Sequence, residues 1–376
     1  MSKIALSTSH LSGHELSYIQ DAFQRNEVSV YGANLVQFEN DLEDYLGENT
    51  KVACTISGTA AIHLALILAG VIQHDEVICQ SMTYVASANP ILYQGAIPVF
   101  VGSETHTWNM CPDALEIAIK DRISKGKIPK AIIVVHSYGM PAQIDKIAKL
   151  AKQYNIILIE DAAEALGSEY KGRKCGTFGD FAVISFNSNK IITTAGGGAI
   201  ICKSEEMKQK AIFLATQARE KVPYYLHSEI GYNYRMNNIA AGIGRAQMNV
   251  LQNYIKKRRE NHDFYTKLFK NIEGTEVLKE TSTDYFSNHW LTCVLINKEK
   301  AAHSSEELRT ALQNENIESR PLWKPLHLHP MYATFDFYGE KVGENIFNTG
   351  LCLPSGSNLT TQEKERITQV IAAFLA

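Results

Sequence analysis

Short apolar segments alternate with helical patterns through the first two-thirds of the chain. Segments rich in Val, Ile and other apolar residues are predicted as strands at residues 52–56, 76–79, 97–101, 131–135, 156–159, 181–186 and 199–202. Helical stretches separate many of them, including 59–70, 112–120 and 144–154. Such alternation is typical of a largely parallel sheet with helices on both faces. We therefore predict an α/β fold whose large domain contains a mostly parallel, seven-stranded sheet.

The last third of the chain has a different pattern. Residues 234–261 are predicted as one long helix, which ends in the charged run 256–260, interpreted as a solvated face near a helix C-terminus. A strand at 290–296, a helix at 306–314 and a final helix at 362–374 follow. A chain of 376 residues is long enough for a large domain and a smaller one. We expect a large domain over residues 1–250 and a smaller C-terminal α+β domain over 251–376.

Composition argues against several classes of protein. The formal charge of −3 disfavours a nucleic-acid-binding protein, which usually has a basic patch. The 7 cysteines lack paired spacing, which is typical of reduced thiols in the cytoplasm, and no Cys/His cluster has metal-ligand spacing. The strongest apolar stretch, 60–71, is too short to span a bilayer, and the first residues do not resemble a signal peptide. We expect a cytoplasmic protein with no metal and no nucleic-acid or membrane partner.

Two chemically reactive residues follow predicted strands. Lys190 lies between the strand at 181–186 and a run of glycines, and Asp161 comes just after the strand at 156–159. In a parallel sheet such positions lie at the edge where active sites form. Pyridoxal phosphate needs an amine that binds it covalently and a carboxylate that keeps its pyridine nitrogen protonated. Taken singly, however, a loop lysine is more often solvated, and an aspartate after a strand often caps a helix.

The region around these two residues resembles a known family. Residues 160–167 (EDAAEALG), 176–180 (GTFGD) and 185–190 (SFNSNK) are similar to the DegT/DnrJ/EryC1/StrS sugar aminotransferases. The resemblance extends from His10 to His327 and so covers most of the chain. It implies a pyridoxal phosphate enzyme of fold type I, the aspartate aminotransferase fold, with Lys190 and Asp161 as catalytic residues. Some relatives have a histidine in place of this lysine and act as dehydratases, so the lysine favours transamination.

A second motif points to a phosphate site. Ser57, Gly58 and Thr59 follow a predicted strand and open a helix, whose N-terminal amides and dipole favour an anion. A plain Ser/Thr helix cap is the alternative. The resemblance implies that Ser185 adds a hydroxyl to the same phosphate. It also implies that the Tyr84 ring stacks on the pyridine ring and fixes its plane.

The resemblance implies two further cofactor contacts. Glu164 matches a position near the phenolic oxygen of the cofactor, where the family often has Gln or His. Asn233 matches a position that reaches the phosphate bound by the neighbouring subunit, which implies a homodimer, or a higher oligomer, with shared active sites. An asparagine in a turn before a helix is also a common N-cap, and this alternative remains open.

The strongest signal outside the cofactor region is the stretch 320–327. The Arg320 guanidinium suits a carboxylate or a phosphate, and Trp323 offers a flat face to a sugar or a base. The resemblance implies that this stretch, with His327 at its end, lines the substrate site; a structural turn made by two prolines is the alternative. His10 and Tyr31 match loops that contact the hexose in relatives.

Within the family, residues 187–194 and 319–325 look most like the bacillosamine-type enzymes. That resemblance implies transfer of the amino group of L-glutamate to the C4 keto group of UDP-4-keto-6-deoxy-N-acetylglucosamine, for bacterial glycan biosynthesis. A 3-keto sugar nucleotide or a keto-cyclitol is an alternative acceptor. A non-catalytic regulatory protein that keeps the fold is a further alternative, disfavoured because Lys190 and Asp161 are retained. A nicotinamide dehydrogenase is disfavoured because no GxGxxG follows the first strands.

Overall fold

A central sheet organises the larger part of the chain. The computed structural model describes residues 2–375, and within them eight strands form this sheet in the order β1-β9-β8-β5-β4-β2-β3-β14. Their bounds are β1 (Lys51–Thr55), β2 (Glu76–Gln80), β3 (Ile97–Val101), β4 (Ala131–Val135), β5 (Ile157–Asp161), β8 (Phe181–Ser185), β9 (Gly198–Cys202) and β14 (Phe337–Tyr338). β9 is antiparallel to both neighbours and the other pairings are parallel, which confirms the mostly parallel sheet.

The sheet has one strand more than the seven that were predicted. The additional strand is β14, which comes from the last part of the chain and pairs in parallel with β3. A two-residue strand has no periodic signal, so the sequence pattern does not reveal it. The buried Arg122 guanidinium forms ion pairs with Glu76 of β2 and with Asp336, and so holds β14 on the sheet.

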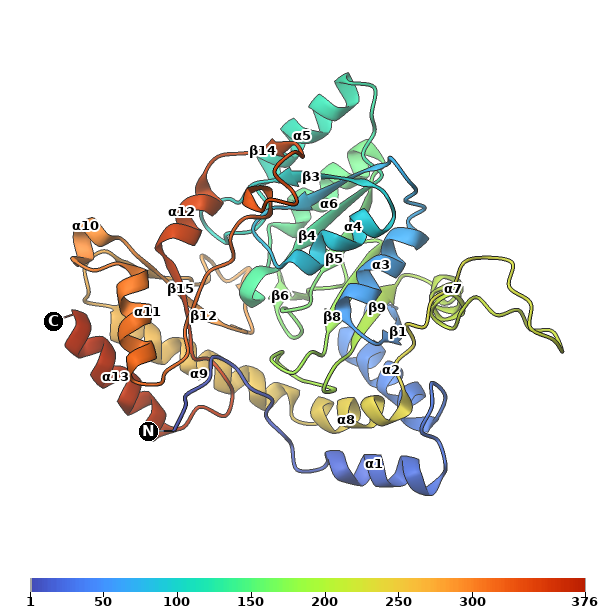
Figure 1. Ribbon diagram of the computed structural model, residues 1–376, viewed down its shortest axis with the longest axis horizontal. Helices are drawn as coiled ribbons and strands as arrows, with labels where there is room; N and C mark the ends of the chain where they lie inside the picture. Colours follow the sequence, from blue (N-terminus) through green and yellow to red (C-terminus); the bar gives the residue numbers. More distant parts are fainter. Residues whose placement is uncertain (1, 376) are drawn as a thin grey trace.

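Helices cover both faces of this sheet (Figure 1). On one face lie α3 (Gly58–Leu68), α4 (Asn89–Tyr93) and α7 (Glu205–Ala215). On the other face lie α2 (Ala33–Leu46), α5 (Pro112–Ser124) and α6 (Ile144–Tyr154). Side chains of one strand alternate between these faces: Val183 packs with α3, whereas Ala182 and Ile184 pack with α2. Burial of both faces explains why the strands are continuously apolar.

The predicted long helix over 234–261 is wrong: two helices occupy this region, α8 (Asn238–Met248) and α9 (Leu251–Phe269). They are separated at Asn249 and Val250, and Val250 has a non-helical conformation. The charged run 256–260 therefore lies in the middle of α9, not near its end. Arg258 within that run is fully buried, whereas Lys256 and Glu260 are exposed, so only part of the run is a solvated face. α9 continues to Phe269 because Tyr265 and Phe269 extend its buried stripe into the C-terminal core.

The C-terminal part forms a second sheet, in the order β10-β12-β15-β13. Its strands are β10 (Thr275–Val277), β12 (Thr292–Ile296), β15 (Gly350–Leu353) and β13 (Arg320–Pro321). Its helices, beside α9, are α10 (Lys298–Ala301), α11 (Ser305–Asn314), α12 (Val342–Thr349) and α13 (Thr361–Leu375). Ile4 pairs with Ile317 and packs in the core of this part. The domain boundary at residue 250 stays a prediction. Ile4 precedes this position but pairs with Ile317, and β14 follows it but pairs with β3 of the central sheet.

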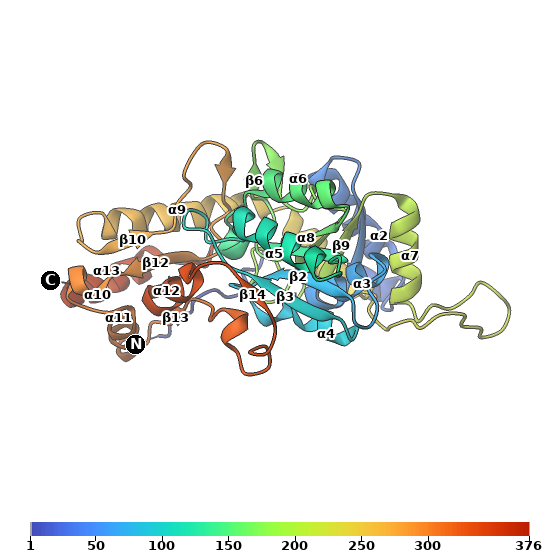
Figure 2. The ribbon, with the colours of Figure 1, turned by 90° about the horizontal axis from the view of Figure 1, so that it is seen from above.

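Smaller elements complete the fold. α1 (Glu15–Gln24) packs against α8, and a small sheet joins β11 (Tyr285–Phe286), β6 (Glu169–Tyr170) and β7 (Arg173–Lys174). Short 3-10 turns occupy Val85–Ser87, Ser137–Gly139 and Leu326–Leu328. The loop between α7 and α8 projects far from the body of the molecule (Figures 1 and 2). Over residues 2–375 we find no helix with the length and apolar character that a membrane span requires.

Candidate active site

A cavity of about 610 Å³ lies between the carboxyl edge of the central sheet and the C-terminal sheet. Its lining comes from the ends of β1, β5 and β8 on one side and from β13 and β15 on the other. The structure brings these predicted residues together in its lining: Ser57, Gly58, Thr59, Tyr84, Asp161, Glu164, Ser185, Lys190, Arg320 and Trp323. The cavity thus lies where a parallel sheet positions its active site.

Lys190 lies on the loop that joins β8 to β9. Phe186 and Gly197 close this loop, because the Phe186 N–H donates to the Gly197 carbonyl at 2.9 Å. The Lys190 side chain is 13% exposed, and its Nζ lies 3.2 Å from Glu164 Oε1. On another side, Nζ lies 4.1 Å from the centroid of the Trp290 ring. The amine is thus nearly removed from water, beside one carboxylate and one aromatic face.

The Asp161 carboxylate is held in a fixed orientation at the end of β5. Ser87 Oγ donates to Asp161 Oδ2 at 2.7 Å, and the Ala163 N–H donates to Oδ1 at 3.1 Å. Thr83 Oγ1 lies 2.9 Å from Ser87 Oγ and extends this set of hydrogen bonds. Hydrogen bonds to both oxygens fix the carboxylate in one orientation. Asp161 is therefore suited to hold a protonated ring nitrogen.

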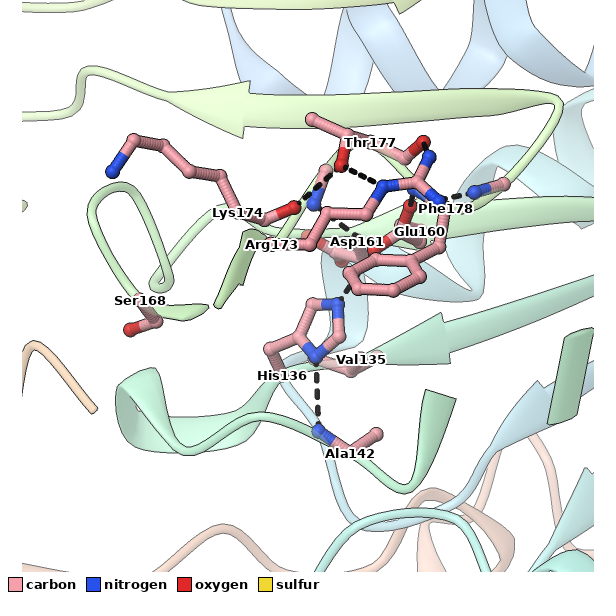
Figure 3. Close-up of polar contacts among 12 residues, drawn as sticks. Val135, His136, Ala142, Glu160, Asp161, Ser168, Arg173, Lys174, Thr177 and Phe178 are labelled. Carbon is pink, nitrogen blue, oxygen red and sulfur yellow. Dashed lines mark hydrogen bonds and ion pairs between the residues drawn. The ribbon is translucent and has the colours of Figure 1, made fainter. Parts of the chain in front are cut away.

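The preceding residue, Glu160, fixes the end of β5 from the opposite face (Figure 3). Its fully buried carboxylate accepts hydrogen bonds of 2.6–2.9 Å from the His136 ring and from the backbone N–H groups of Gly176, Phe178 and Gly179. The Ala142 N–H donates to His136 Nδ1 at 3.0 Å, so Nε2 carries the proton that the ring donates to Glu160. Burial raises the pKa of Glu160, but these hydrogen bonds outweigh it and hold the pKa below its usual value.

Glu164 lies three residues after Asp161, in a turn that follows β5, and faces the Lys190 amine. Its second oxygen, Oε2, accepts a hydrogen bond from the Tyr138 N–H at 2.7 Å. Burial raises the pKa of Glu164 to about 7, and the neighbouring Lys190 ammonium opposes this rise. A carboxyl group with this pKa exchanges a proton readily near neutral pH.

The start of α3 forms a close cradle at one end of the cavity. Ser57 Oγ accepts a hydrogen bond from the Ala60 N–H at 3.1 Å, so the predicted helix cap is present. Gly58 and Thr59 belong to the first turn, where backbone N–H groups have no acceptor within the helix. A Cβ on Gly58 would lie 3.2 Å from Ser185 Cβ, so a larger residue would fill the cradle. The N-terminal amides and the Ser185 hydroxyl are the donors that a phosphate needs.

Four predicted site residues do not line this cavity in the single chain: His10, Tyr31, Asn233 and His327. His10 stacks on Tyr254 and contacts Ser357 Oγ through Nδ1, and Ser81 Oγ contacts Nδ1 of His327 at 2.7 Å. Tyr31 and Asn233 instead line a separate depression beside α7 and the projecting loop. The contacts that the resemblance implies for these four residues stay predictions.

The cavity residues that were not predicted include Ser87, Tyr138 and Trp290. Tyr138 stacks on Trp323, with ring centroids 4.5 Å apart, and its hydroxyl accepts the Trp323 N–H at 2.9 Å. Tyr138 follows the end of β4, so the rule that active sites lie beyond strand ends could have found it. Trp290 comes from the C-terminal part of the chain, and no local sequence pattern connects it to Lys190.

Comparison with known proteins agrees with this geometry. Residues 10–373 match the DegT/DnrJ/EryC1/StrS aminotransferase family. The chain is 46% identical over 374 residues to "Putative pyridoxal phosphate-dependent aminotransferase EpsN" of Bacillus subtilis, a match that covers 98% of this chain and 95% of that protein. It is 37% identical to the GDP-perosamine synthase of Escherichia coli O157:H7, with 97% of this chain and 96% of that protein covered.

Solved structures agree as well. The aminotransferase PseC of Helicobacter pylori, involved in pseudoaminic acid biosynthesis, superimposes with a TM-score of 0.90 at 25% identity, over 100% of this chain and 99% of that one. Fold and site together define a pyridoxal phosphate-dependent aminotransferase. The chain belongs to the DegT/DnrJ/EryC1/StrS aminotransferase family.

Proposed function

We propose that this sugar aminotransferase transfers the amino group of L-glutamate to the C4 keto group of UDP-4-keto-6-deoxy-N-acetylglucosamine. The observation that carries the aminotransferase activity is the presence of Lys190, Asp161 and the Ser57–Thr59 cradle in the lining of one cavity. This set provides an amine, a carboxylate and an anion site, and each corresponds to one functional group of pyridoxal phosphate.

The cofactor, when bound, supplies an electron sink for the bond broken at the α-carbon of the donor. We assign its phosphate to Ser57, Gly58, Thr59 and Ser185, because these residues form a close-packed set of donors. Asp161 would hold the ring nitrogen, since its carboxylate is fixed by hydrogen bonds from Ser87 and Ala163. Tyr84 is 59% exposed in the single chain and lines the cavity, which leaves its ring face free to stack.

Lys190 would hold and move protons in both halves of the reaction. Once its amine is free, it can take the proton from the α-carbon of the donor and later return a proton to the acceptor carbon. Glu164 lies at 3.2 Å from that amine and can accept a proton from it. Such a pair would keep proton transfer inside a site that is largely closed to water.

For the sugar acceptor, the support comes from the wall opposite the sheet. The stacked rings of Tyr138 and Trp323 form an aromatic surface, and Arg320 is an exposed cation at the mouth of the cavity. An aromatic surface suits the apolar face of a deoxysugar, and a guanidinium suits a diphosphate. A GDP-linked acceptor is a second candidate, because relatives at 35–37% identity are GDP-perosamine synthases.

We also propose a homodimer in which each site is completed by the partner. The projecting loop bears Tyr224, Tyr225 and Ile230, which are 64%, 77% and 81% exposed, and Asn233 lies at its base. Exposed apolar side chains on a projecting loop suit contact with a second copy. Mixing the inactive variants Lys190→Ala and Asn233→Ala should restore up to about a quarter of the activity if sites are shared. Absence of any restored activity would contradict sharing.

The proposed location is the cytoplasm. All seven cysteines are free thiols in the structure, which supports a reducing compartment. Cys293 and Cys352 lie on paired strands with sulfur atoms 3.7 Å apart and are not bonded to each other.

Two half reactions test the function. The visible absorption band of the bound cofactor should disappear with L-glutamate and return with UDP-4-keto-6-deoxy-N-acetylglucosamine. Return with a GDP-linked 4-keto sugar alone would favour the second candidate. A band that responds to glutamate but to neither sugar would contradict both acceptors and leave the aminotransferase class intact.

A further inference from the structure

We propose that Trp290 is a positioning residue for the reacting lysine. Its indole ring holds both the Lys190 amine and the peptide group that precedes Lys190. This inference rests on the proposed function only in taking Lys190 as the reacting amine. Trp290 lies in the segment that leads into β12, about a hundred positions from Lys190 in sequence.

The first contact is between the amine and the ring. Lys190 Nζ lies 4.1 Å from the centroid of Trp290, within the range of a cation–π interaction. Trp290 is 4% exposed and the Lys190 side chain 13%, so little water screens the contact. Glu164 Oε1 lies 3.2 Å from the same amine, so the ammonium has one charged and one aromatic partner.

The second contact is with the backbone. Trp290 Nε1–H donates to the Asn189 carbonyl at 2.8 Å, and Ser7 Oγ donates to the same oxygen at 2.9 Å. Asn189 immediately precedes Lys190, so one indole contacts both the peptide that carries the lysine and the end of its side chain. This double contact reduces the number of positions that the amine can adopt.

Trp290 is itself firmly held. Its N–H donates to Asn288 Oδ1 at 2.8 Å, and Asn288 Nδ2 donates to the Glu164 carbonyl at 2.8 Å. Its carbonyl accepts a hydrogen bond of 2.5 Å from Arg258 Nη1. Arg258 is fully buried, and in the described chain its hydrogen bonds are with two carbonyls and the Ser7 hydroxyl, not with a carboxylate. A buried cation is unfavourable unless it is hydrogen-bonded, so the Arg258 guanidinium needs these carbonyls and the hydroxyl to stay in place. These contacts therefore hold the segment around Trp290 in one position.

The aromatic partner matters because the charge of Glu164 varies. Burial raises the pKa of Glu164 to about 7, so near neutral pH this carboxyl is partly protonated. The indole face does not titrate, so its attraction for the ammonium does not depend on the protonation of Glu164. The other titratable or charged groups that line the cavity are Tyr84, Tyr138, Asp161, Glu318, Arg320 and Cys352.

Competitive acetylation of Lys190 at a fixed pH of about 7, read by mass spectrometry on the full-length protein freed of cofactor, tests this inference. Trp290→Leu removes both contacts and should raise the acetylation rate of Lys190 about tenfold, because the ring no longer holds the amine in place. Trp290→Phe keeps a ring and should raise the rate by less than half of that factor. Trp108→Phe, at a buried tryptophan outside the cavity, is the matched control and should leave it unchanged.

A folded Trp290→Leu protein with the wild-type acetylation rate at Lys190 would overturn the inference. Should that variant not fold, biosynthetic replacement of tryptophan by fluorinated tryptophans weakens the ring electrostatics while keeping its size. The acetylation rate of Lys190 should then rise stepwise with fluorination, and a constant rate would overturn the inference. Neither measurement involves glutamate or a sugar, so a wrong acceptor leaves the result unaffected.

Discussion

The Lys190 amine and the Glu164 carboxylate lie 3.2 Å apart, and Glu164 is 5% exposed. A glutamine at this position would place no titratable group beside the lysine. The pair therefore gives this chain a titratable group at the centre of its site, with consequences for stability and for pH dependence.

Replacing Glu164 by Gln should change how stability depends on pH. Because burial raises the pKa of Glu164 from 4.5 to about 7, its stabilising contribution is present below pH 4.5 and is lost as the pH rises through 7. Relative to Glu164→Gln, the wild type should lose about 3 kcal/mol between these limits. Thermal unfolding of both cofactor-free proteins from pH 4.5 to 8 measures the difference. A constant difference across this range would contradict the assignment.

The stacked imidazoles of His262 and His289 should produce the opposite dependence. Their ring centroids are 3.6 Å apart, and burial lowers the pKa of both, most strongly that of His289. Their contribution is therefore present above the unfolded pKa of 6.5 and is lost as the pH falls below it.

His289→Asn should accordingly make unfolding less sensitive to acid between pH 6.5 and 5. Asparagine suits the positive φ of 47° at this position. His106→Gln, at an exposed histidine, is the control and should leave the acid sensitivity as it is. Equal acid sensitivity in the wild type and His289→Asn would rule out a role for the pair.

Removal of the Ser87 hydroxyl should weaken cofactor binding. Ser87 Oγ donates to Asp161 Oδ2 at 2.7 Å, and a hydrogen bond to a charged group contributes about 1.5–3 kcal/mol. We expect Ser87→Ala to raise the dissociation constant for pyridoxal phosphate about tenfold or more. Fluorescence titration measures it, and Ser17→Ala on the exposed face of α1 is the control. Unchanged affinity in Ser87→Ala would show that Asp161 needs no such partner.

Two glycines of one run should differ sharply in their tolerance of a methyl group. A Cβ on Gly198 would lie 2.5 Å from the Gly58 nitrogen, whereas a Cβ on Gly196 would have no atom within 4 Å. Gly198→Ala should therefore push apart β9 and the start of α3, destabilise the fold by about 1–3 kcal/mol and release the cofactor. Gly196→Ala should retain both properties. Thermal unfolding and cofactor content measure the two effects, and similar behaviour of the variants would contradict the predicted clash.

Sequence patterns predict the elements that are long and locally encoded. The strands at 97–101 and 131–135 and the helix at 144–154 have the predicted bounds. β14 could not be found, because two residues gain strand geometry only from contact with β3. The break between α8 and α9 has no proline or glycine to mark it.

The residues of the candidate site also fall into two groups, those that a local sequence pattern predicts and those that only the folded chain brings into place. Asp161 and Lys190 are recognisable because each follows a strand of the sheet, whereas Trp290 reaches the cavity only through long-range folding. Tyr31 and Asn233 lie in a separate depression of the single chain. They could contact a cofactor cavity only if that cavity belonged to a second copy of the chain.

The most direct test of the central claim is to locate the covalent bond between protein and cofactor. Purified protein loaded with pyridoxal phosphate is reduced with borohydride, digested and analysed by mass spectrometry, with Lys190→Ala treated in parallel. The account predicts that the reduced cofactor is found on Lys190 in the wild type and on no lysine in the variant. Modification of another lysine in the wild type, or equal modification of both proteins, would contradict it.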